Sequence, residues 1–173
     1  IGLVAAEALA GMGARIVLVA RDKGRAEATL ARIRAKGSAA HSVHYADLTA
    51  LADMRRVGAE IAAAEPRIDV LINNAGALYT HRQVTADGLE RTFATNHLAY
   101  FVLTEMLRGS LVAVAPSRIV NTASRAHVGE SIDFADLQAA NNYNGRSVYG
   151  RSKLLNILFT RELARRLTGT GVT

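Results

Sequence analysis

Tyr149 and Lys153 are the two side chains of this sequence best suited to do chemistry together. They are four residues apart on a predicted helix, so they share one face of it. A nearby ammonium group stabilises a tyrosine phenolate, and lowering a tyrosine pKa by about 3 units needs roughly 4 kcal/mol. The pair therefore suits a tyrosine that exchanges protons at neutral pH, although two such residues are also common on ordinary helix surfaces.

Three other polar groups lie where a ligand could reach them. Ser124 directly follows a predicted strand, and the segment 73–76 (Asn-Asn-Ala-Gly) follows another. Ligands of open parallel sheets bind at the carboxyl ends of strands, and small residues let a ligand approach the backbone. Asn96 lies inside a predicted helix, where asparagine has poor propensity. Taken singly, each could instead be a turn residue, a cap or a solvated position.

The elements that must position these groups alternate between apolar runs and helical patterns. Continuous apolar runs predict buried strands over residues 15–20, 42–46, 68–73 and 118–122. Helices are predicted over 22–36 with Gly37 as C-cap, from a Thr49 cap to Glu65, over 88–114, and over 146–167. The chain opens directly into a helix, and 127–144 is polar and irregular with a short helix at most.

This alternation predicts an α/β fold with a doubly wound parallel sheet in a three-layer α/β/α arrangement. The length of 173 residues suits a single domain, and half of the residues are hydrophobic, enough for a sizeable core. No interdomain linker interrupts it. We therefore expect one domain over residues 1–173.

Composition excludes several classes of protein. The absence of cysteine excludes disulfides, and the five histidines show no metal-ligand spacing, so no metal site is expected. No apolar run approaches a membrane span, and the sequence shows no signal peptide, although a truncated start could have lost one; we expect a cytoplasmic location. The net charge of +6 is compatible with a nucleic-acid or anionic-lipid binder. The basic residues are scattered over periodic helices, which favours solvated helix faces and a few groups for a phosphate-bearing ligand. No nucleic-acid partner is therefore expected.

Together, the segment 73–76, Asn96, Ser124, Tyr149 and Lys153 resemble, in order and spacing, the motifs of short-chain dehydrogenases/reductases. The segment 149–164 is similar to the catalytic helix of the family's retinol-dehydrogenase-like branch. The resemblance covers essentially the whole chain and implies a Rossmann-type NAD(P)-binding domain.

The resemblance also implies catalytic roles. Tyr149 would be the general acid/base, and Lys153 would lower the tyrosine pKa and bind the nicotinamide ribose. Ser124 would orient the substrate oxygen, and Asn96 would hold a water that links Lys153 to solvent. Hydride transfer would belong to the cofactor.

Further positions correspond to the family's cofactor contacts. Arg21 follows the strand that ends at Ala20, where an arginine can pair with a 2′-phosphate, so NADP(H) is favoured over NAD(H). Asp22 beside it could be a helix N-cap or a competing ribose ligand. Asp47 and Leu48 match the family's adenine-contacting pair, although Asp47 could also be a turn aspartate. The other expected contacts are Asn74, Ala75 and Gly76, with Tyr149 and Lys153 at the ribose.

The chain departs from the family pattern at its ends. Only Ile1 and Gly2 match the last two positions of the glycine-rich phosphate-binding turn, and the family's first strand and last strands are missing. Without the first strand, strands 15–20 and 68–73 would lie about 9.6 Å apart, two strand spacings. We therefore expect a segment of a longer protein, with direct pairing of these strands as the alternative.

The expected function is hydride transfer between NADP(H) and an alcohol or carbonyl on a small apolar substrate, retinal-like by branch resemblance. The alternative is an inactive fragment that serves at most as a nucleotide-binding or protein-interaction module, because the phosphate-binding turn is incomplete. Family members often associate through two long helices, so a homodimer or homotetramer through 88–114 and 146–167 is expected.

Overall fold

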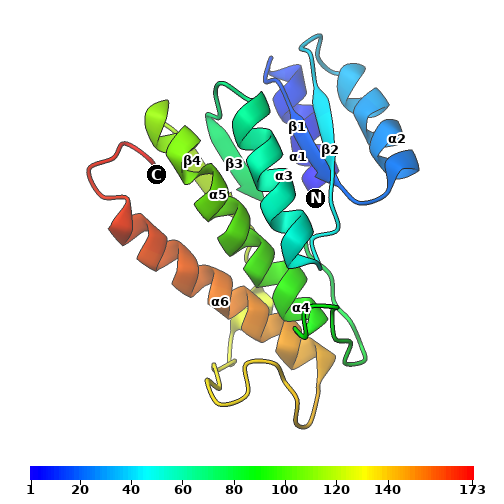
Figure 1. Ribbon diagram of the computed structural model, residues 1–173, viewed down its shortest axis with the longest axis vertical. Helices are drawn as coiled ribbons and strands as arrows, with labels where there is room; N and C mark the ends of the chain where they lie inside the picture. The colour runs from blue at the N-terminus through cyan, green and yellow to red at the C-terminus, as the bar shows by residue number, and fades with distance from the viewer. The chain divides into compact units, whose positions relative to one another are not determined.

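Short parallel strands alternate with helices along the chain, as the sequence predicted (Figure 1). The computed structural model describes all residues from Ile1 to Thr173. They form two compact units, Ile1–Asp47 and Leu48–Thr173. Each unit contains one two-stranded parallel sheet with its own helices.

The first unit is a helix followed by a β-α-β segment. Its elements in order are α1 (Gly2–Gly11), β1 (Val17–Ala20), α2 (Lys23–Arg34) and β2 (Ser42–Tyr45). β1 and β2 pair in parallel, and α2, which connects them, packs on both. α1 lies beside α2, where Glu7 and Arg32 form an ion pair of 2.8 Å. The side chain of Asp22 accepts a hydrogen bond from the Arg25 amide at 2.7 Å, so this aspartate is the N-cap of α2.

Gly37 does not have the capping role predicted for it. α2 ends at Arg34 and its C-cap is Ala35. A Cβ on Gly37 would lie 2.2 Å from the carbonyl oxygen of Ala10, at the end of α1. The glycine is needed because two backbone segments pass very close to each other there.

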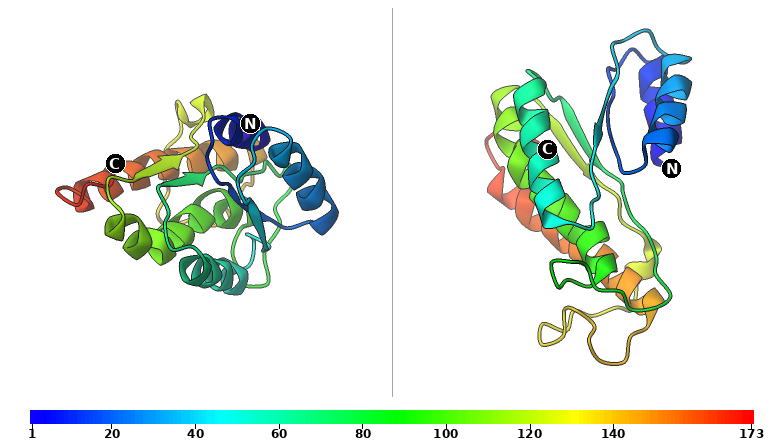
Figure 2. Two further views of the ribbon diagram at one scale, coloured as in Figure 1. Left: turned by 90° about the horizontal axis from the view of Figure 1, so that it is seen from above. Right: turned by 45° about the vertical axis from the view of Figure 1, so that its right-hand side comes forward.

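The second unit packs its helices against the other strand pair. Its elements in order are α3 (Leu51–Ala64), β3 (Val70–Asn73), α4 (Arg91–Phe93), the π-helical turn η1 (Ala94–Leu98), α5 (Ala99–Ala113), β4 (Arg118–Asn121), the 3₁₀ turn η2 (Arg125–His127) and α6 (Gly145–Arg166). Helices α3 and α5 lie side by side over one face of the β3–β4 pair (Figure 2). Buried residues of α3 and α5, among them Met54, Val57, Leu107 and Leu111, form the core of this unit.

The helix predicted over 88–114 is neither as long nor as regular as expected. Gly88 has a φ of +78°, and its amide closes a turn onto the Thr85 carbonyl, so the helix begins only at Arg91. Glu90 is the N-cap and accepts hydrogen bonds from the amides of Thr92 and Phe93. The π-helical turn η1 then widens the helix around Asn96 before regular α-helix resumes.

The start of α3 also differs from the prediction. Its N-cap is Ala50, one residue beyond the predicted Thr49 cap, and it makes no side-chain capping bond. The amide of Leu51 instead donates to the carboxylate of Asp87 at 2.8 Å. The helix start therefore takes its acceptor from a distant loop, which local sequence cannot indicate.

None of the helices combines the length and apolar character that crossing a bilayer would require.

Two helical glycines of the second unit should respond oppositely to alanine. A Cβ at Gly58 would lie 2.7 Å from the Cβ of Met106 across the α3–α5 contact, whereas Gly109 has nothing within 4 Å. Gly58→Ala should lower the free energy of unfolding by about 1–3 kcal/mol through overpacking. Gly109→Ala should raise it by about 0.5–1 kcal/mol through helix propensity. Urea unfolding of both variants measures this, and a stabilised Gly58→Ala would contradict the α3–α5 packing.

Candidate active site

Amide and hydroxyl groups join the carboxyl ends of β3 and β4. Asn73 and Asn121 are direct register partners, and the Asn73 Nδ2 donates to the Asn121 Oδ1 at 2.8 Å. The same Nδ2 donates to the Thr104 hydroxyl of α5 at 3.0 Å, and the Asn121 Nδ2 donates to the Thr160 hydroxyl of α6 at 2.9 Å. This chain of hydrogen bonds fixes both strand ends relative to the two helices that carry the candidate residues.

Asn96 holds the backbone of the loop that follows β3. It is fully buried, its Oδ1 accepts from the Ala77 amide at 2.8 Å, and its Nδ2 donates to the Ala77 carbonyl at 2.9 Å. The Nδ2 also donates to the Ser152 hydroxyl of α6 at 3.1 Å. The side chain thus connects the 74–77 loop to α6, and its predicted water-holding role stays a prediction.

The π-helical turn presents the main-chain carbonyl of Asn96 to α6. The Asn156 Nδ2 donates to this carbonyl at 2.9 Å, and the Asn156 Oδ1 pairs with the His97 Nδ1 at 3.0 Å. Because the oxygen of Asn156 can only accept, the His97 Nδ1 carries the proton in this contact. Burial lowers the pKa of His97, and the hydrogen bond with Asn156 raises it by a smaller amount. The net effect lowers the pKa, so the imidazole stays neutral at physiological pH.

Lys153 places a buried ammonium group beside Tyr149. The residue is 2% exposed, and its Nζ donates to the main-chain carbonyl of Thr122, just beyond β4, at 3.0 Å. The Nζ lies 5.6 Å from the centroid of the Tyr149 ring. Burial lowers the pKa of Lys153. The structure therefore brings together the lysine and tyrosine that the sequence pattern paired.

The turn that carries Ser124 packs against α6 next to Tyr149. η2 directly follows Ser124 and contacts α6. A Cβ on Gly150 would lie 2.3 Å from the Ala126 carbonyl oxygen, so the missing side chain permits this close approach. Ser124 thus lies between two residues that contact α6. Thr122 contacts Lys153, and Ala126 contacts Gly150.

Local hydrogen bonds fix the conformation of Ser124. Its hydroxyl oxygen accepts from the Ala126 amide at 3.2 Å as the N-cap of η2. Its carbonyl accepts from the His127 Nδ1 at 2.6 Å. The serine is half-buried, and an oxygen that accepts one bond still has its own proton to donate.

Gly76 is the predicted cofactor contact nearest to these groups. A Cβ there would lie 3.2 Å from the Asn96 Oδ1 and 3.5 Å from the Lys153 Nζ. Asn74 and Ala75, also predicted contacts, are half-buried in the same loop, and Leu48 is half-buried before α3. A side chain in place of Gly76 would meet the Asn96 amide oxygen at a tight distance and the Lys153 ammonium at an ordinary contact distance, so the glycine keeps the loop backbone close to both groups.

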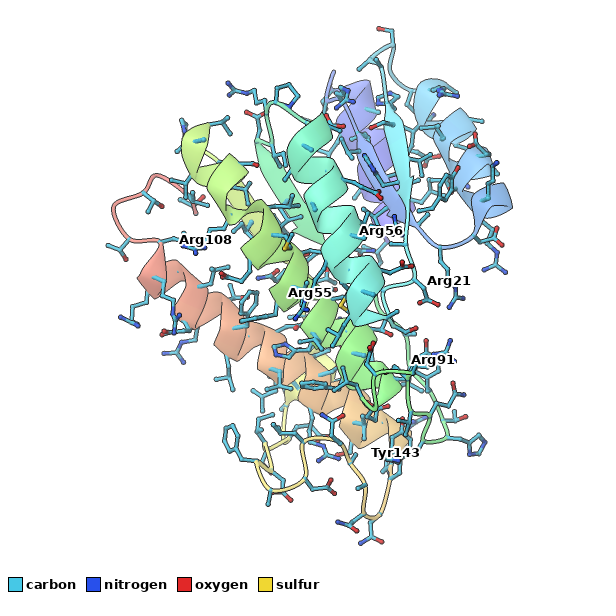
Figure 3. All side chains as sticks on the ribbon, in the orientation of Figure 1. Arg21, Arg55, Arg56, Arg91, Arg108 and Tyr143 are labelled. Carbon is cyan, nitrogen blue, oxygen red and sulfur yellow. The ribbon has the colours of Figure 1, made fainter.

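Within the first unit, Arg21 and Arg25 share an open hollow beyond β1. The hollow is lined by Leu18, Ala20, Arg21, Asp22, Arg25, Ala26 and Thr29. Arg21, labelled in Figure 3, lies 3.8 Å from the carboxylate of Asp47 through its Nη1. Both members of this ion pair were predicted cofactor contacts. Asp22 beside them is the N-cap of α2, which is one of the two roles that the sequence left open for it.

Ile1 and Gly2 form the start of α1 in the first unit. Ile1 is the N-cap and Gly2 is the first helical residue. The early amides of a helix carry partial positive charge and suit a phosphate group. The pyrophosphate contact that the resemblance implies for these two residues stays a prediction.

Several contacts hold the start of α6 against the segment around Tyr79 in the second unit. The Tyr143 hydroxyl donates to the Tyr79 carbonyl at 3.0 Å, and the Arg91 guanidinium lies 4.6 Å from the Tyr79 ring centroid. Arg91 and Tyr143 appear at the same end of the unit in Figure 3. A Cβ on Gly145 would lie 2.3 Å from the same Tyr79 carbonyl. The first turn of α6 is thereby held against the segment that follows β3.

Sequence reasoning missed several residues that organise this site. They are Thr122, whose carbonyl accepts a hydrogen bond from the Lys153 ammonium, and the buried Ser152 and Asn156, which bond to Asn96. His127, which holds the Ser124 carbonyl, is a fourth. Asn156 had a usable signal, because it lies seven residues after Tyr149 and three after Lys153, on the same helix face. The Thr122 carbonyl had none.

Comparison with known proteins identifies the family of the chain. The chain matches the sequence model for the short chain dehydrogenase family over residues 1–173. It is 44% identical to Retinol dehydrogenase 13 of Homo sapiens over 175 residues, covering 100% of this chain and 53% of that protein. It is 43% identical to Retinol dehydrogenase 14 of Mus musculus over 184 residues, covering 100% and 55%. The chain thus spans about half the length of the curated relatives it matches.

A solved structure shows the same fold. The short-chain dehydrogenase from Sphingobium yanoikuyae, in complex with NADPH, superposes with a TM-score of 0.80 and 31% identity, covering 99% of this chain and 62% of that one. The predicted α/β class with a Rossmann-type parallel sheet is therefore confirmed. By sequence and by fold, the chain belongs to the short-chain dehydrogenase family, and it is similar to that family's retinol dehydrogenases.

Proposed function

We propose that the whole protein transfers a hydride between NADP(H) and the alcohol or carbonyl group of a small apolar substrate. The observation that carries this proposal is the Lys153 ammonium, withdrawn from water and 5.6 Å from the ring of Tyr149. Placing an ammonium in the protein interior costs free energy, so a lysine kept there calls for a functional explanation. Stabilising a tyrosinate next to it is such an explanation.

The proposed roles follow the placement of each group. In carbonyl reduction Tyr149 gives its phenolic proton to the substrate oxygen, and in alcohol oxidation it takes that proton back. Lys153 stabilises the resulting phenolate by its charge. Ser124 donates a hydrogen bond to the same oxygen, with its backbone held by His127. When bound, the nicotinamide supplies or accepts the hydride.

Asn96 is proposed to act as a positioning residue in this reaction. Its amide holds Ala77 at both the N–H and the C=O, which fixes the loop containing Gly76 beside Lys153. Its carbonyl, bonded to Asn156, keeps α6 in place next to the π-helical turn. A water between Asn96 and Lys153 remains part of the proposal.

The proposed contacts for NADP(H) are given for each unit by itself. In the first unit, Ile1 and Gly2 would receive the pyrophosphate, and Arg21 the 2′-phosphate, with Asp47 near the adenine. In the second unit, the proposed contacts are Leu48, Asn74, Ala75, Gly76, Tyr149 and Lys153. Two arginines in one hollow, Arg21 and Arg25, offer two positive charges to the additional 2′-phosphate by which NADP(H) differs from NAD(H), and so support NADP(H).

A retinoid-like substrate is supported by the similarity to retinol dehydrogenases. The segment between η2 and α6 also exposes apolar side chains. Val128, Phe134 and Leu137 are 69%, 78% and 38% exposed. Such side chains suit contact with a hydrocarbon chain.

Self-association is proposed through α5 and α6, within the predicted ranges 88–114 and 146–167. Phe101 of α5 and Leu158 of α6 are exposed, and Phe101 packs on Phe159 with ring centroids 5.7 Å apart. Exposed apolar side chains on adjoining helices favour burial against a second copy.

Tyr149→Phe removes the proposed acid/base group and should lower kcat about 100- to 10,000-fold. NADPH oxidation in the presence of retinal or a small apolar ketone, followed by absorbance, measures this. Tyr45→Phe is the matched control, because it removes another tyrosine hydroxyl, the one bonded to Glu27 at 2.8 Å, and should keep activity. Equal turnover by Tyr149→Phe and wild type would exclude the proposed chemistry. Tight NADPH binding with no turnover by wild type would favour a nucleotide-binding module.

Lys153→Met should change how stability depends on pH. Burial lowers the pKa of Lys153 below its usual 10.5, so between the two values the unfolded chain binds more protons than the folded one. The stability penalty of the ammonium is therefore full below the folded pKa and disappears as pH rises toward 10.5. The free energy of unfolding of wild type should therefore rise relative to that of Lys153→Met as the pH is raised from 7 to about 10.

Urea unfolding at a series of pH values measures this difference. Lys36→Met is the control, since it removes an exposed ammonium and should show a difference that changes little with pH. A pH-independent difference for Lys153→Met would show that the lysine is not desolvated.

Arg21→Ala should weaken NADPH binding about 10- to 100-fold, the contribution of a charge-assisted contact of roughly 1.5–3 kcal/mol. NADH binding should change little, because NADH lacks the 2′-phosphate. Isothermal titration calorimetry with both nucleotides distinguishes the two effects. Arg34→Ala removes the same charge at the opposite end of α2 and serves as control. Equal losses for NADH and NADPH would overturn the assignment of Arg21.

A further inference from the structure

Tyr100 lies one helical turn beyond Asn96, and neither the family motifs nor the proposed mechanism use it. It is 1% exposed at the start of α5. Its hydroxyl is also buried and makes no hydrogen bond of standard geometry, although the nearby Thr122 side chain acts to lower its pKa against the larger effect of burial. A buried hydroxyl without a partner destabilises a protein by roughly 1–3 kcal/mol relative to a satisfied one. A tyrosine at this place therefore calls for an explanation beyond filling the core.

The ring of Tyr100 contacts the ammonium of Lys153. The Nζ lies 5.6 Å from the Tyr100 ring centroid, the same separation as from Tyr149. Both values fall within the range of about 6 Å in which a cation is attracted to an aromatic face. The ammonium is thus bordered by two rings, one from α5 and one from its own helix.

Few other groups are present to compensate this charge. The Thr122 carbonyl, just beyond β4, accepts from the Nζ at 3.0 Å, and Gly76 and Asn96 border it from the loop after β3 and from η1. The titratable groups that face it are Tyr149 on α6 and Tyr100 on α5. No carboxylate forms an ion pair with Lys153, and no neighbouring cation perturbs it. Burial raises the pKa of Tyr100, so this tyrosine stays neutral at physiological pH and acts through its ring.

We propose that Tyr100 is a positioning residue whose ring keeps Lys153 in its charged form and holds the ammonium against Tyr149. The ring supplies the electrostatic compensation that a carboxylate would otherwise give, without a counter-charge that would bind the ammonium and neutralise its effect on the phenol. This inference rests on the proposed function, because the ammonium matters to catalysis only if Tyr149 is the acid/base group.

Replacing Tyr100 by phenylalanine or by an aliphatic residue separates the ring from the hydroxyl. Tyr100→Phe keeps the aromatic face and removes the unpartnered hydroxyl, so it should unfold at a higher temperature than wild type with Lys153 unchanged. Tyr100→Leu removes the ring, so the charged form of Lys153 should lose stabilisation. Tyr100→Met, whose longer and more flexible side chain adapts better to the space left by the ring, is the substitute if the leucine variant does not fold.

The direct measurement is the titration of Lys153 itself in ligand-free protein. Lysine labelled with ¹³C at Cε gives few signals, since this chain holds 3 lysines, Lys23, Lys36 and Lys153. The signal of Lys153 is the one that disappears in Lys153→Met. We expect the same titration midpoint in wild type and Tyr100→Phe, and a midpoint lower by roughly one pH unit in Tyr100→Leu, from a cation–aromatic contact.

The pH profile of kcat for alcohol oxidation gives the second readout. With less charge on Lys153, the Tyr149 phenolate is less stabilised, so the rising limb should move to higher pH in Tyr100→Leu and stay in place in Tyr100→Phe. An unchanged Lys153 midpoint in a folded Tyr100→Leu, or an equal shift in Tyr100→Phe, would overturn the proposal. So would a shifted midpoint with an unchanged kcat profile. A wild-type protein without any activity would instead refute the proposed function, while the NMR comparison would still decide whether the ring stabilises the ammonium.

Discussion

The Lys153 ammonium group is withdrawn from water, and the protein itself has to solvate it. A main-chain carbonyl beyond β4 accepts a hydrogen bond from the ammonium, and aromatic rings from α5 and α6 border it. Each of these groups comes from a different part of the second unit. The ammonium can therefore be accommodated only when the strand end and both helices are correctly placed, so the same packing that buries the charge also assembles the candidate site.

The π-helical turn η1 gives the site a second fixed point. The main-chain carbonyl of Asn96, inside this turn, accepts a hydrogen bond from the Asn156 side chain of α6. The side chain of Asn96 extends the other way, to the backbone of Ala77. A widened turn carries a modest local penalty, and these hydrogen bonds to two neighbouring segments offset it. Such turns recur at functional sites for this reason: they release backbone groups for contacts outside the helix.

Much of this arrangement was predictable from the sequence. Hydrophobic runs and periodicity located all four strands and the main helices, and the spacing of Tyr149 and Lys153 placed both on one helix face. The start predicted at Gly88 was wrong because of a local turn, and two other errors fell where a distant segment overrides a local signal. The start of α3 depends on the carboxylate of Asp87, and Gly37 is required by the approach of α1. The acceptor for Lys153 is a backbone oxygen, which every residue possesses, so no residue type could have revealed it.

The amide pair at the ends of β3 and β4 couples strand alignment to the chemistry above it. Asn73 and Asn121 face each other across one rung of the ladder, and each also reaches a helix hydroxyl. Sliding either strand by a single residue would turn one amide to the opposite face and break the whole chain of bonds. A misaligned sheet would thus leave buried amides unsatisfied at the very edge where ligands of such folds bind. Mispaired intermediates are thereby penalised at this point, and selection for a working site also selects for correct strand pairing.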